Sequence, residues 1–236
     1  IQSLNQKKYR QKYNLFVVEG IKNIKEFVFS NFSVKSIYAI ESIPFLNDSE
    51  YELISYDDLK KISFLKTPHN ALALVEIPES EINKIKGVQI VLDEIQDPGN
   101  LGTIIRLADW YGIEQIICSY GTVDVYNPKV VQSTMGSLSR VNIVYTDLVK
   151  FLSEVNLPVF ATDMNGENIY STSLPQEALL VMGNEGNGIS DTVESLCSHT
   201  LTIPRFGKSK KTESLNVAMS TGIILSEFFS QKVRNE

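Results

Sequence analysis

Residues 203–220 read IPRFGKSKKTESLNVAMS and mark a junction between a strand and a long helix. An apolar, strand-like segment ends at Ile203 and Pro204, and a basic segment follows it. From Ser214 to about residue 231 the apolar residues recur with helical spacing. Such a junction presents unpaired backbone N–H groups and small polar side chains at a helix N-terminus, which favours ligand binding.

The composition is that of a globular protein, with 43% hydrophobic and 21% charged residues in 236. No apolar run approaches the roughly 18 residues of a membrane span, and the first residues are polar and then basic, unlike a secretory signal. The cysteines (Cys118 and Cys197) and histidines (His69 and His199) are scattered singly, without metal-site spacing. We therefore expect a cytoplasmic protein with reduced thiols, no metal and no membrane segment.

The net charge of −6 argues against a nonspecific nucleic-acid coat, but the basic residues are clustered. One cluster precedes the first acid, Glu19, and comprises Lys7, Lys8, Arg10 and Lys12. The second lies in the junction and comprises Arg205, Lys208, Lys210 and Lys211. Both could contact the phosphate backbone of a nucleic acid. The alternative is two solvated loops, and charge alone does not separate these interpretations.

Alternating strand and helix patterns divide the chain into two α/β units. Residues 1–78 begin with a basic arm and continue as short strands and helices, and residues 79–87 read as a polar linker. Residues 88–236 alternate strictly between strand and helix, which predicts a mostly parallel sheet covered on both faces. In this unit we expect Asn100 to cap a helix over 101–111.

Three loops at expected strand ends are rich in glycine, asparagine and other small residues: 93–103, 183–190 and 204–214. Because ligands of parallel sheets bind at the carboxyl ends of the strands, these loops could form one site. Their glycines have the wrong spacing or order for a dinucleotide-binding loop, and no P-loop is present. A nucleophilic serine triad is also not supported, since neither histidine lies near such a loop.

Arg106 is expected on the helix face away from the apolar positions, with Gly102 one turn before it and Asp109 one turn after. An ion pair with Asp109 would explain it without a ligand. A guanidinium beside a glycine also suits phosphate or carboxylate recognition.

Three further polar residues allow two interpretations each. Glu185, between glycines after a buried strand, is a turn acid or a group that positions a hydroxyl or cation. Ser214 and Asn216 are ordinary helix-capping residues or polar groups of a site.

Three segments carry a family resemblance. The first is Asn100-Leu-Gly-Thr-Ile-Ile-Arg106 with the preceding Leu92-Asp93 and Asp97-Pro98-Gly99, and the second is Val181-Met-Gly-Asn-Glu-Gly-Asn-Gly188. The third combines Ile203-Pro204 with Glu213-Ser-Leu-Asn-Val217. In this order they resemble the SpoU/TrmH family of RNA ribose 2′-O-methyltransferases, within the SPOUT superfamily. The resemblance covers about 88–236, and residues 1–78 are more loosely similar to the family's RNA-binding substrate domain.

The resemblance implies a SPOUT-like parallel sheet with a C-terminal trefoil knot, S-adenosylmethionine bound by the knot loops, and a homodimer in which the motif-one arginine serves the other subunit. The implied catalytic residues are Asn100, Arg106, Glu185, Ser214 and Asn216. The implied cofactor-binding residues are Val181, Met182, Gly183, Glu185, Ile203, Ser214, Leu215 and Asn216. Val181, Met182 and Ile203 would offer apolar contacts to the adenine.

The implied reaction is attack of a ribose 2′-hydroxyl on the sulfonium methyl group, in structured rRNA or tRNA. Family interpretations make Arg106 the base, but an arginine is effectively always protonated, so we favour a phosphate and oxyanion clamp. The proton acceptor is then Ser214, Glu185 or a substrate phosphate. The alternative function is a noncatalytic RNA-binding or assembly protein that retains the fold.

One departure from the family pattern lies in the junction. The segment 205–212 is longer than usual and carries four basic residues. We expect it to project toward RNA; the alternative is that it alters the methyl-donor pocket.

Overall fold

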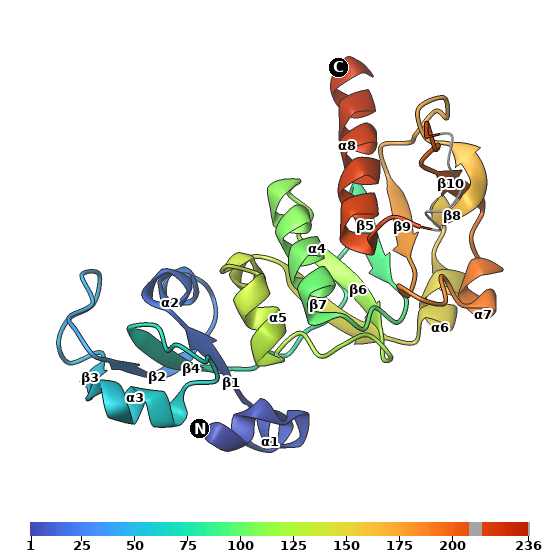
Figure 1. Ribbon diagram of the computed structural model, residues 1–236. Helices are drawn as coiled ribbons and strands as arrows, with labels where there is room; N and C mark the ends of the chain where they lie inside the picture. The colour runs from blue at the N-terminus through green and yellow to red at the C-terminus, as the bar shows by residue number, and fades with distance from the viewer. Residues whose placement is uncertain (208–213, 236) are drawn as a thin grey trace. The chain divides into compact units, whose positions relative to one another are not determined.

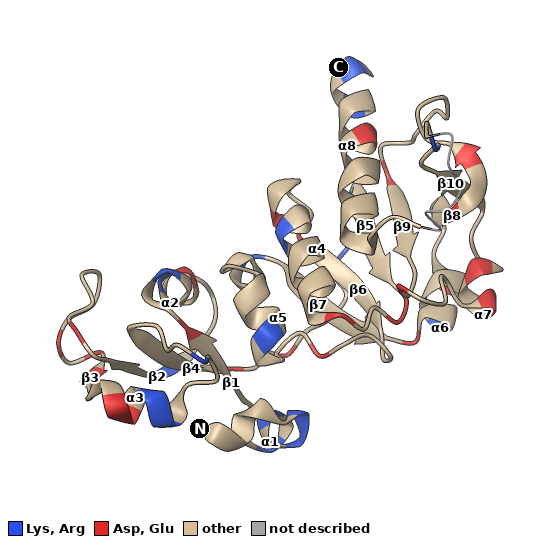
Figure 2. Ribbon diagram, viewed as in Figure 1, with Lys and Arg blue, Asp and Glu red and all other residues tan. Residues whose placement is uncertain are grey.

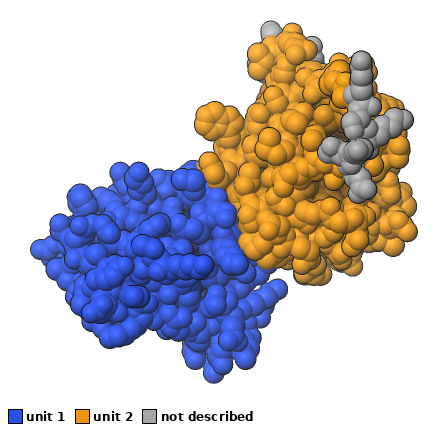
Figure 3. Space-filling view, in the orientation of Figure 1, with its two compact units in different colours: residues 1–79, 124–140 blue, residues 80–123, 141–236 orange. Residues whose placement is uncertain are grey.

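The structure, a computed structural model, describes residues 1–207 and 214–235 and divides into two compact units (Figure 1, Figure 3). The first unit comprises residues 1–79 and 124–140, and the second comprises residues 80–123 and 141–236. Three of the expected RNA-binding residues, Lys208, Lys210 and Lys211, lie outside the described residues.

The first unit is built on a four-stranded mixed sheet with the order β1-β4-β2-β3. Strand β4 is antiparallel to β1 and β2, and β2 is parallel to β3. The elements are η1 (Gln2–Asn5), α1 (Lys7–Tyr13), β1 (Leu15–Glu19), α2 (Ile21–Val28), β2 (Val34–Ala39), β3 (Glu52–Leu53), α3 (Tyr56–Ile62), β4 (Ala71–Glu76), α5 (Pro128–Ser133) and η2 (Ser137–Ser139).

Residues 124–140 pack with the first unit, whereas the sequence pattern places them in the second domain. Helix α5 contacts β1, and the rings of Phe16 and Tyr126 have centroids 4.7 Å apart. Asn127 caps α5 as its sequence predicts, by accepting a hydrogen bond from the Lys129 N–H. Helical periodicity identifies α5 but cannot say which of two sheets it covers.

The basic arm expected at the N-terminus is helix α1, and Arg10 within it is buried, with only 2% of its surface exposed. Its guanidinium forms an ion pair with Asp124 and donates to the carbonyls of Leu4 (2.7 Å) and Asn5 (3.0 Å). The assignment of Arg10 to an RNA-binding surface was therefore wrong. The helical turn carries this one side chain inward, whereas Lys7, Lys8 and Lys12 are exposed.

The second unit contains a six-stranded sheet with the order β10-β8-β9-β5-β6-β7, in which every described strand pair is parallel. Strands β5 and β9 at its centre are buried throughout, as their predominantly apolar sequences predict. The elements are β5 (Val88–Leu92), α4 (Pro98–Trp110), β6 (Gln115–Ser119), β7 (Asn142–Thr146), α6 (Leu148–Glu154), β8 (Val159–Asn168), β9 (Ala178–Met182), α7 (Asp191–Glu194), β10 (His199–Thr202) and α8 (Val217–Asn235).

Helix α4 begins one turn earlier than the sequence analysis expected. Asp97, not Asn100, is its N-cap, and the Asp97 carboxylate accepts a hydrogen bond from the Asn100 N–H. Pro98 occupies the first helical turn, where its missing N–H leaves no helix bond unmade. The Asn100 side chain is thereby available for other contacts.

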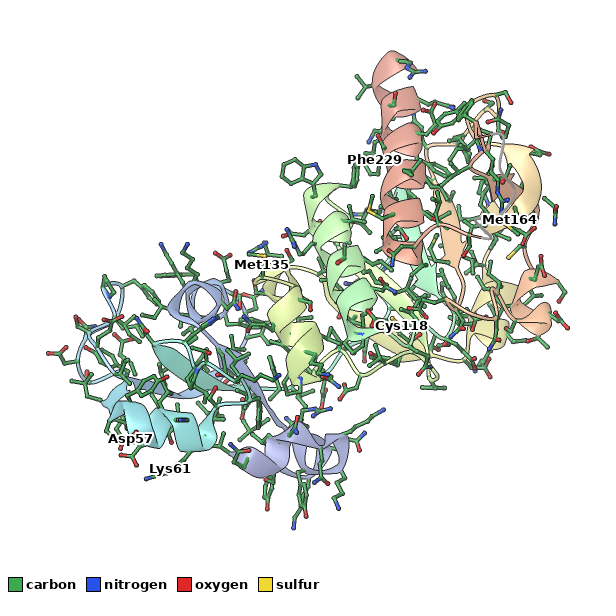
Figure 4. All side chains as sticks on the ribbon, viewed as in Figure 1. Asp57, Lys61, Cys118, Met135, Met164 and Phe229 are labelled. Carbon is green, nitrogen blue, oxygen red and sulfur yellow. The ribbon has the colours of Figure 1, made fainter. Side chains whose placement is uncertain are left out.

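Both cysteine thiols have raised pKa values because they are desolvated, with that of Cys197 at about 11. Cys118 lies within the sheet of the second unit (Figure 4). Neither thiol is therefore an activated nucleophile at neutral pH. Within the described residues there is no group of three His, Cys, Asp or Glu side chains suited to a metal, and none of the helices has the length and hydropathy of a membrane span.

Arg10→Ala is expected to lower the free energy of unfolding by about 3–5 kcal/mol, because it leaves Asp124 without its buried cation and two carbonyls without a donor. Urea denaturation of the full chain measures this. Lys12→Ala, on the exposed side of the same helix, is the control and should change stability by at most about 0.5 kcal/mol. Equal urea concentrations at the unfolding midpoint for the two variants would contradict the structural role of Arg10.

Candidate functional site

Three side chains from the three strand-end loops form a continuous hydrogen-bonded chain. Asn216 Nδ2 donates to Asn100 Oδ1 at 2.9 Å, and Asn100 Nδ2 donates to Glu185 Oε1 at 2.9 Å. Asn100 is on α4, Glu185 follows β9, and Asn216 precedes α8. The loops meet because parallel strands direct their carboxyl ends to one edge of the sheet.

The capping of the N-terminus of helix α8 sets the orientation of the Asn216 and Asn100 side-chain amides. Asn216 Oδ1 accepts hydrogen bonds from the N–H groups of Ala218 (3.0 Å) and Met219 (3.2 Å), as an N-cap residue does. The oxygen is thereby engaged, so the Asn216 NH₂ group must face Asn100. Asn100 therefore accepts from Asn216 with its oxygen. Its nitrogen faces Glu185 and needs an acceptor there, which the carboxylate provides.

Glu185 accepts two further hydrogen bonds, from the backbone N–H groups of Gln96 and Asp97, each at 3.3 Å. Both carboxylate oxygens are therefore occupied by donors from the loop between β5 and α4. These contacts hold that loop against the loop that follows β9.

The loop after β9 is folded closely on itself. A Cβ atom at Gly183 would lie 2.3 Å from the backbone of Gly188 and Ile189, so only glycine fits there. Asn184 Oδ1 accepts from the N–H groups of Gly186 and Asn187, and its Nδ2 donates to the carbonyl of Glu94 at 2.7 Å. The backbone of this loop is thus fixed before any ligand binds.

Sequence reasoning missed Asn184 and a second polar contact at the same edge. Asp93 is buried and accepts hydrogen bonds from both the N–H and the hydroxyl group of Ser190. Their position in the sequence was the available signal. Asp93 directly follows the buried strand β5, and Asn184 lies two residues after the buried strand β9. Polar residues at such places need partners.

The chain matches two family descriptions over most of its length. Residues 87–226 match the SpoU rRNA Methylase family, and residues 1–73 match the MRM3-like substrate binding domain. The chain belongs to the SpoU rRNA methylase family.

Several SpoU relatives match over more than nine tenths of this chain. The 23S rRNA (guanosine(2553)-2′-O)-methyltransferase RlmP of Bacillus subtilis is 30% identical over 230 residues, which cover 94% of this chain and 91% of the relative. A TrmH-family protein from Porphyromonas gingivalis has a similar structure, with a TM-score of 0.86, 36% identity and coverage of 96% of this chain and 94% of that one. The SpoU methyltransferase AviRb of Streptomyces viridochromogenes, in complex with AdoMet, has a TM-score of 0.83 at 25% identity. The match covers 98% of this chain and 96% of that one.

Within this SpoU chain, Arg106 does not join the hydrogen-bonded chain. It is exposed on α4, six residues after Asn100 and four before the exposed Trp110. Ser214 and Leu215 are also exposed, and Ile203 is half-buried. The structure thus brings together three of the five expected catalytic residues, Asn100, Glu185 and Asn216.

Two expected adenine contacts are not accessible. Val181 belongs to the buried core of the second unit, and the Met182 side chain is 2% exposed. The two side chains lie on opposite faces of the sheet, and both are buried because β9 is a central strand. As described, these two side chains offer no exposed surface to an adenine, while Ile203 and Leu215 are accessible.

In the second basic cluster only Arg205 is described. It is exposed, and its Nη2 lies 2.9 Å from the sulfur of Met164, a residue of β8 (Figure 4).

Asn216→Asp tests the hydrogen-bonded chain. The new carboxylate still caps α8 but cannot donate to Asn100, so the contact with Glu185 should weaken. We expect the free energy of unfolding to stay within about 1 kcal/mol of wild type. The backbone amides of Gln96 and Asp97 should exchange with deuterium about tenfold faster, as for loss of about 1.4 kcal/mol.

The matched control is Asn127→Asp, the same change at the N-cap of α5 in the other unit. It should leave exchange at Gln96 and Asp97 unchanged. Unchanged exchange in the Asn216→Asp variant would show that the chain does not hold the loop.

Proposed function

We propose that this chain transfers a methyl group from S-adenosylmethionine to a ribose 2′-hydroxyl of structured rRNA or tRNA. The observation that carries the proposal is the chain Asn216–Asn100–Glu185, which links the three motif loops of a SpoU family member at one edge of its sheet. The names of the B. subtilis relative and the AviRb complex support the same chemistry.

The residues at this edge fit S-adenosylmethionine. Gly183 allows the loop after β9 to close on its own backbone, which leaves a fixed surface of peptide groups beside the strand ends. Half-buried Ile203 and exposed Leu215 offer apolar area for an adenine, and peptide groups can give specificity. When bound, S-adenosylmethionine supplies an electrophilic methyl group.

The chain's own residues then act mainly by positioning. Asn100, Glu185 and Asn216 hold the loops in register, and Arg106 binds a substrate phosphate and the developing negative charge on oxygen. Glu185 is less suited to accept the proton, because both its oxygens accept N–H groups. The proton then passes to a substrate phosphate, either directly or through the Ser214 hydroxyl, which gives up its own proton as it accepts one.

We propose that Lys7, Lys8 and Lys12, exposed on α1, contact RNA phosphates. Arg205, with Lys208, Lys210 and Lys211 of the long basic segment, is proposed to do the same. The alternative of a noncatalytic RNA-binding protein is disfavoured, because RNA binding alone does not require the ordered chain from Asn216 to Glu185.

The test is incubation with isotopically labelled S-adenosylmethionine and total RNA, followed by nucleoside analysis. Label is expected on ribose 2′-oxygen. Arg106→Ala should lower the rate of transfer about 10²–10³-fold while RNA binding persists. Arg234→Ala, at an exposed arginine on α8, is the control and should transfer at the wild-type rate. Label on a base, or on no RNA, would overturn the proposal.

We further propose a homodimer that buries one face of α4 and α8. These helices pack together through Gly222 against Leu107 and through the rings of Tyr111 and Phe229, 4.9 Å apart. Beside this contact three large apolar side chains are exposed: Trp110 (84%), Met219 and Val233. Exposed apolar area of this kind marks an association surface.

The proposed face includes site residues. Arg106 is one turn before Trp110 on α4, and Met219 is three residues after Asn216. A self-complementary interface over both helices brings Arg106 of the partner subunit toward Asn216. Each site would then contain residues of both subunits.

Trp110→Glu is expected to convert the dimer to monomer in sedimentation analysis, because a charge would have to be buried in the interface. Val149→Glu, at an exposed apolar position on α6, should remain dimeric. Mixing Arg106→Ala and Asn216→Ala subunits should restore transfer, since one site of each mixed dimer regains both residues. Wild-type monomers, or no restoration, would contradict the shared site.

We also propose that the trefoil knot of the SPOUT superfamily forms in the second unit. The strand order supports it, because β9 lies between β5 and β8 while the later strand β10 pairs on the other side of β8. The proposed location is the cytoplasm, in keeping with an rRNA-modifying relative in B. subtilis.

A further inference from the structure

Helix α1 presents two lysine–tyrosine pairs one turn apart. Lys8 Nζ lies 4.9 Å from the centroid of the Tyr9 ring, and Lys12 Nζ lies 5.4 Å from that of Tyr13. The two rings are nearly parallel, with centroids 6.3 Å apart and an angle of 12° between their planes. Tyr13 is 51% exposed. We call these four residues the Lys–Tyr ladder.

The ladder is held in place from the opposite side of the helix. An isolated helix of seven residues is unstable in water. Buried Arg10 fixes α1 through Asp124 and two backbone carbonyls. The rings and ammonium groups are therefore presented in a defined arrangement.

The positive charge of the ladder is not compensated nearby. Residues 1–18 contain no acid, and no ion pair joins Lys8 or Lys12 to an acid among the described residues. Figure 2 shows α1 carrying basic residues and no acidic ones. Solvated helices commonly carry lysines, but solvation does not explain two parallel rings beside them, one half-buried (Tyr9) and one exposed (Tyr13).

Parallel aromatic rings beside cations match the chemistry of unpaired nucleotides. Every base has a face that stacks on a ring, and the adjoining phosphates pair with ammonium groups. A duplex hides its base faces inside the helix and offers only phosphates and groove edges. The ladder is thus complementary to single-stranded RNA, whereas lysines alone would bind either form.

We propose that the Lys–Tyr ladder binds an unpaired segment of the substrate RNA, with bases stacked on Tyr13 and Tyr9 and phosphates on Lys12 and Lys8. This inference rests on the proposed function and adds the class of RNA structure that the first unit selects. The recognised element is a loop, bulge or single-stranded end.

The experiment measures binding of the full chain to a mixed-sequence RNA of about ten nucleotides, as a single strand and annealed to its complement. Tyr13→Ala should weaken single-strand binding by about 5- to 100-fold and leave the salt dependence of binding unchanged. Tyr13→Phe, which keeps the ring, should bind as wild type. Lys12→Gln should reduce the slope of log affinity against log salt by about 0.7.

Two matched controls lie on α3 of the same unit. Tyr56 is 47% exposed and Lys60 is exposed, so Tyr56→Ala and Lys60→Gln remove similar groups outside the ladder. Both should bind single-stranded RNA as wild type does. Thermal melting of each variant checks that it is folded.

The inference is overturned if the Tyr13→Ala and Tyr56→Ala variants bind single-stranded RNA with the same affinity. It is also overturned if Tyr13→Ala weakens duplex binding as much as single-strand binding. Its failure is distinct from failure of the proposed function. If the wild-type protein methylates ribose but the tyrosine variants bind normally, only the ladder is wrong. If it methylates no RNA, the proposed function fails whatever the binding data show.

Discussion

The side-chain amide of Asn216 connects helix capping to the assembly of the site. Its oxygen satisfies two N–H groups at the start of α8, and this fixes its nitrogen toward Asn100. Asn100 in turn can only donate to an acceptor, which Glu185 provides. One local requirement, that the first N–H groups of a helix find partners, therefore sets the orientation of side chains that are 116 and 85 residues apart in sequence.

The loops of the second unit that carry these side chains are held by many local hydrogen bonds and close backbone contacts. Parallel strands bring three loop starts to one edge, and the close backbone contact at Gly183 and the side-chain bonds of Asn184 fix one loop. Glu185 fixes another through the N–H groups of Gln96 and Asp97. A surface built from fixed peptide groups suits a reaction in which placement of the reactants supplies much of the rate.

In the first unit, basic side chains within about one turn of helix α1 have two different roles, one structural and one available for ligand binding. Lys8, Arg10 and Lys12 form one basic cluster in the sequence, but α1 directs Arg10 inward to Asp124 and leaves the lysines in solvent. Burying a guanidinium is costly unless its donors are paired, and here Asp124 and two carbonyls pair them. The inward residue orders the helix, and the outward ones remain available for a ligand.

From the sequence one can predict the alternating α/β pattern, the strands β5 and β9, the cap at Asn127 and the three loops that carry Asn100, Glu185 and Asn216, because periodicity and turn chemistry are local. Family resemblance supplied the methyl-transfer chemistry. The folded chain was needed to show that α5 covers the first sheet, that Arg10 is buried, that Val181 and Met182 are buried in β9, and that Asp97 rather than Asn100 caps α4. Each of these depends on which distant group lies opposite a side chain, and a pattern along one segment does not contain that information.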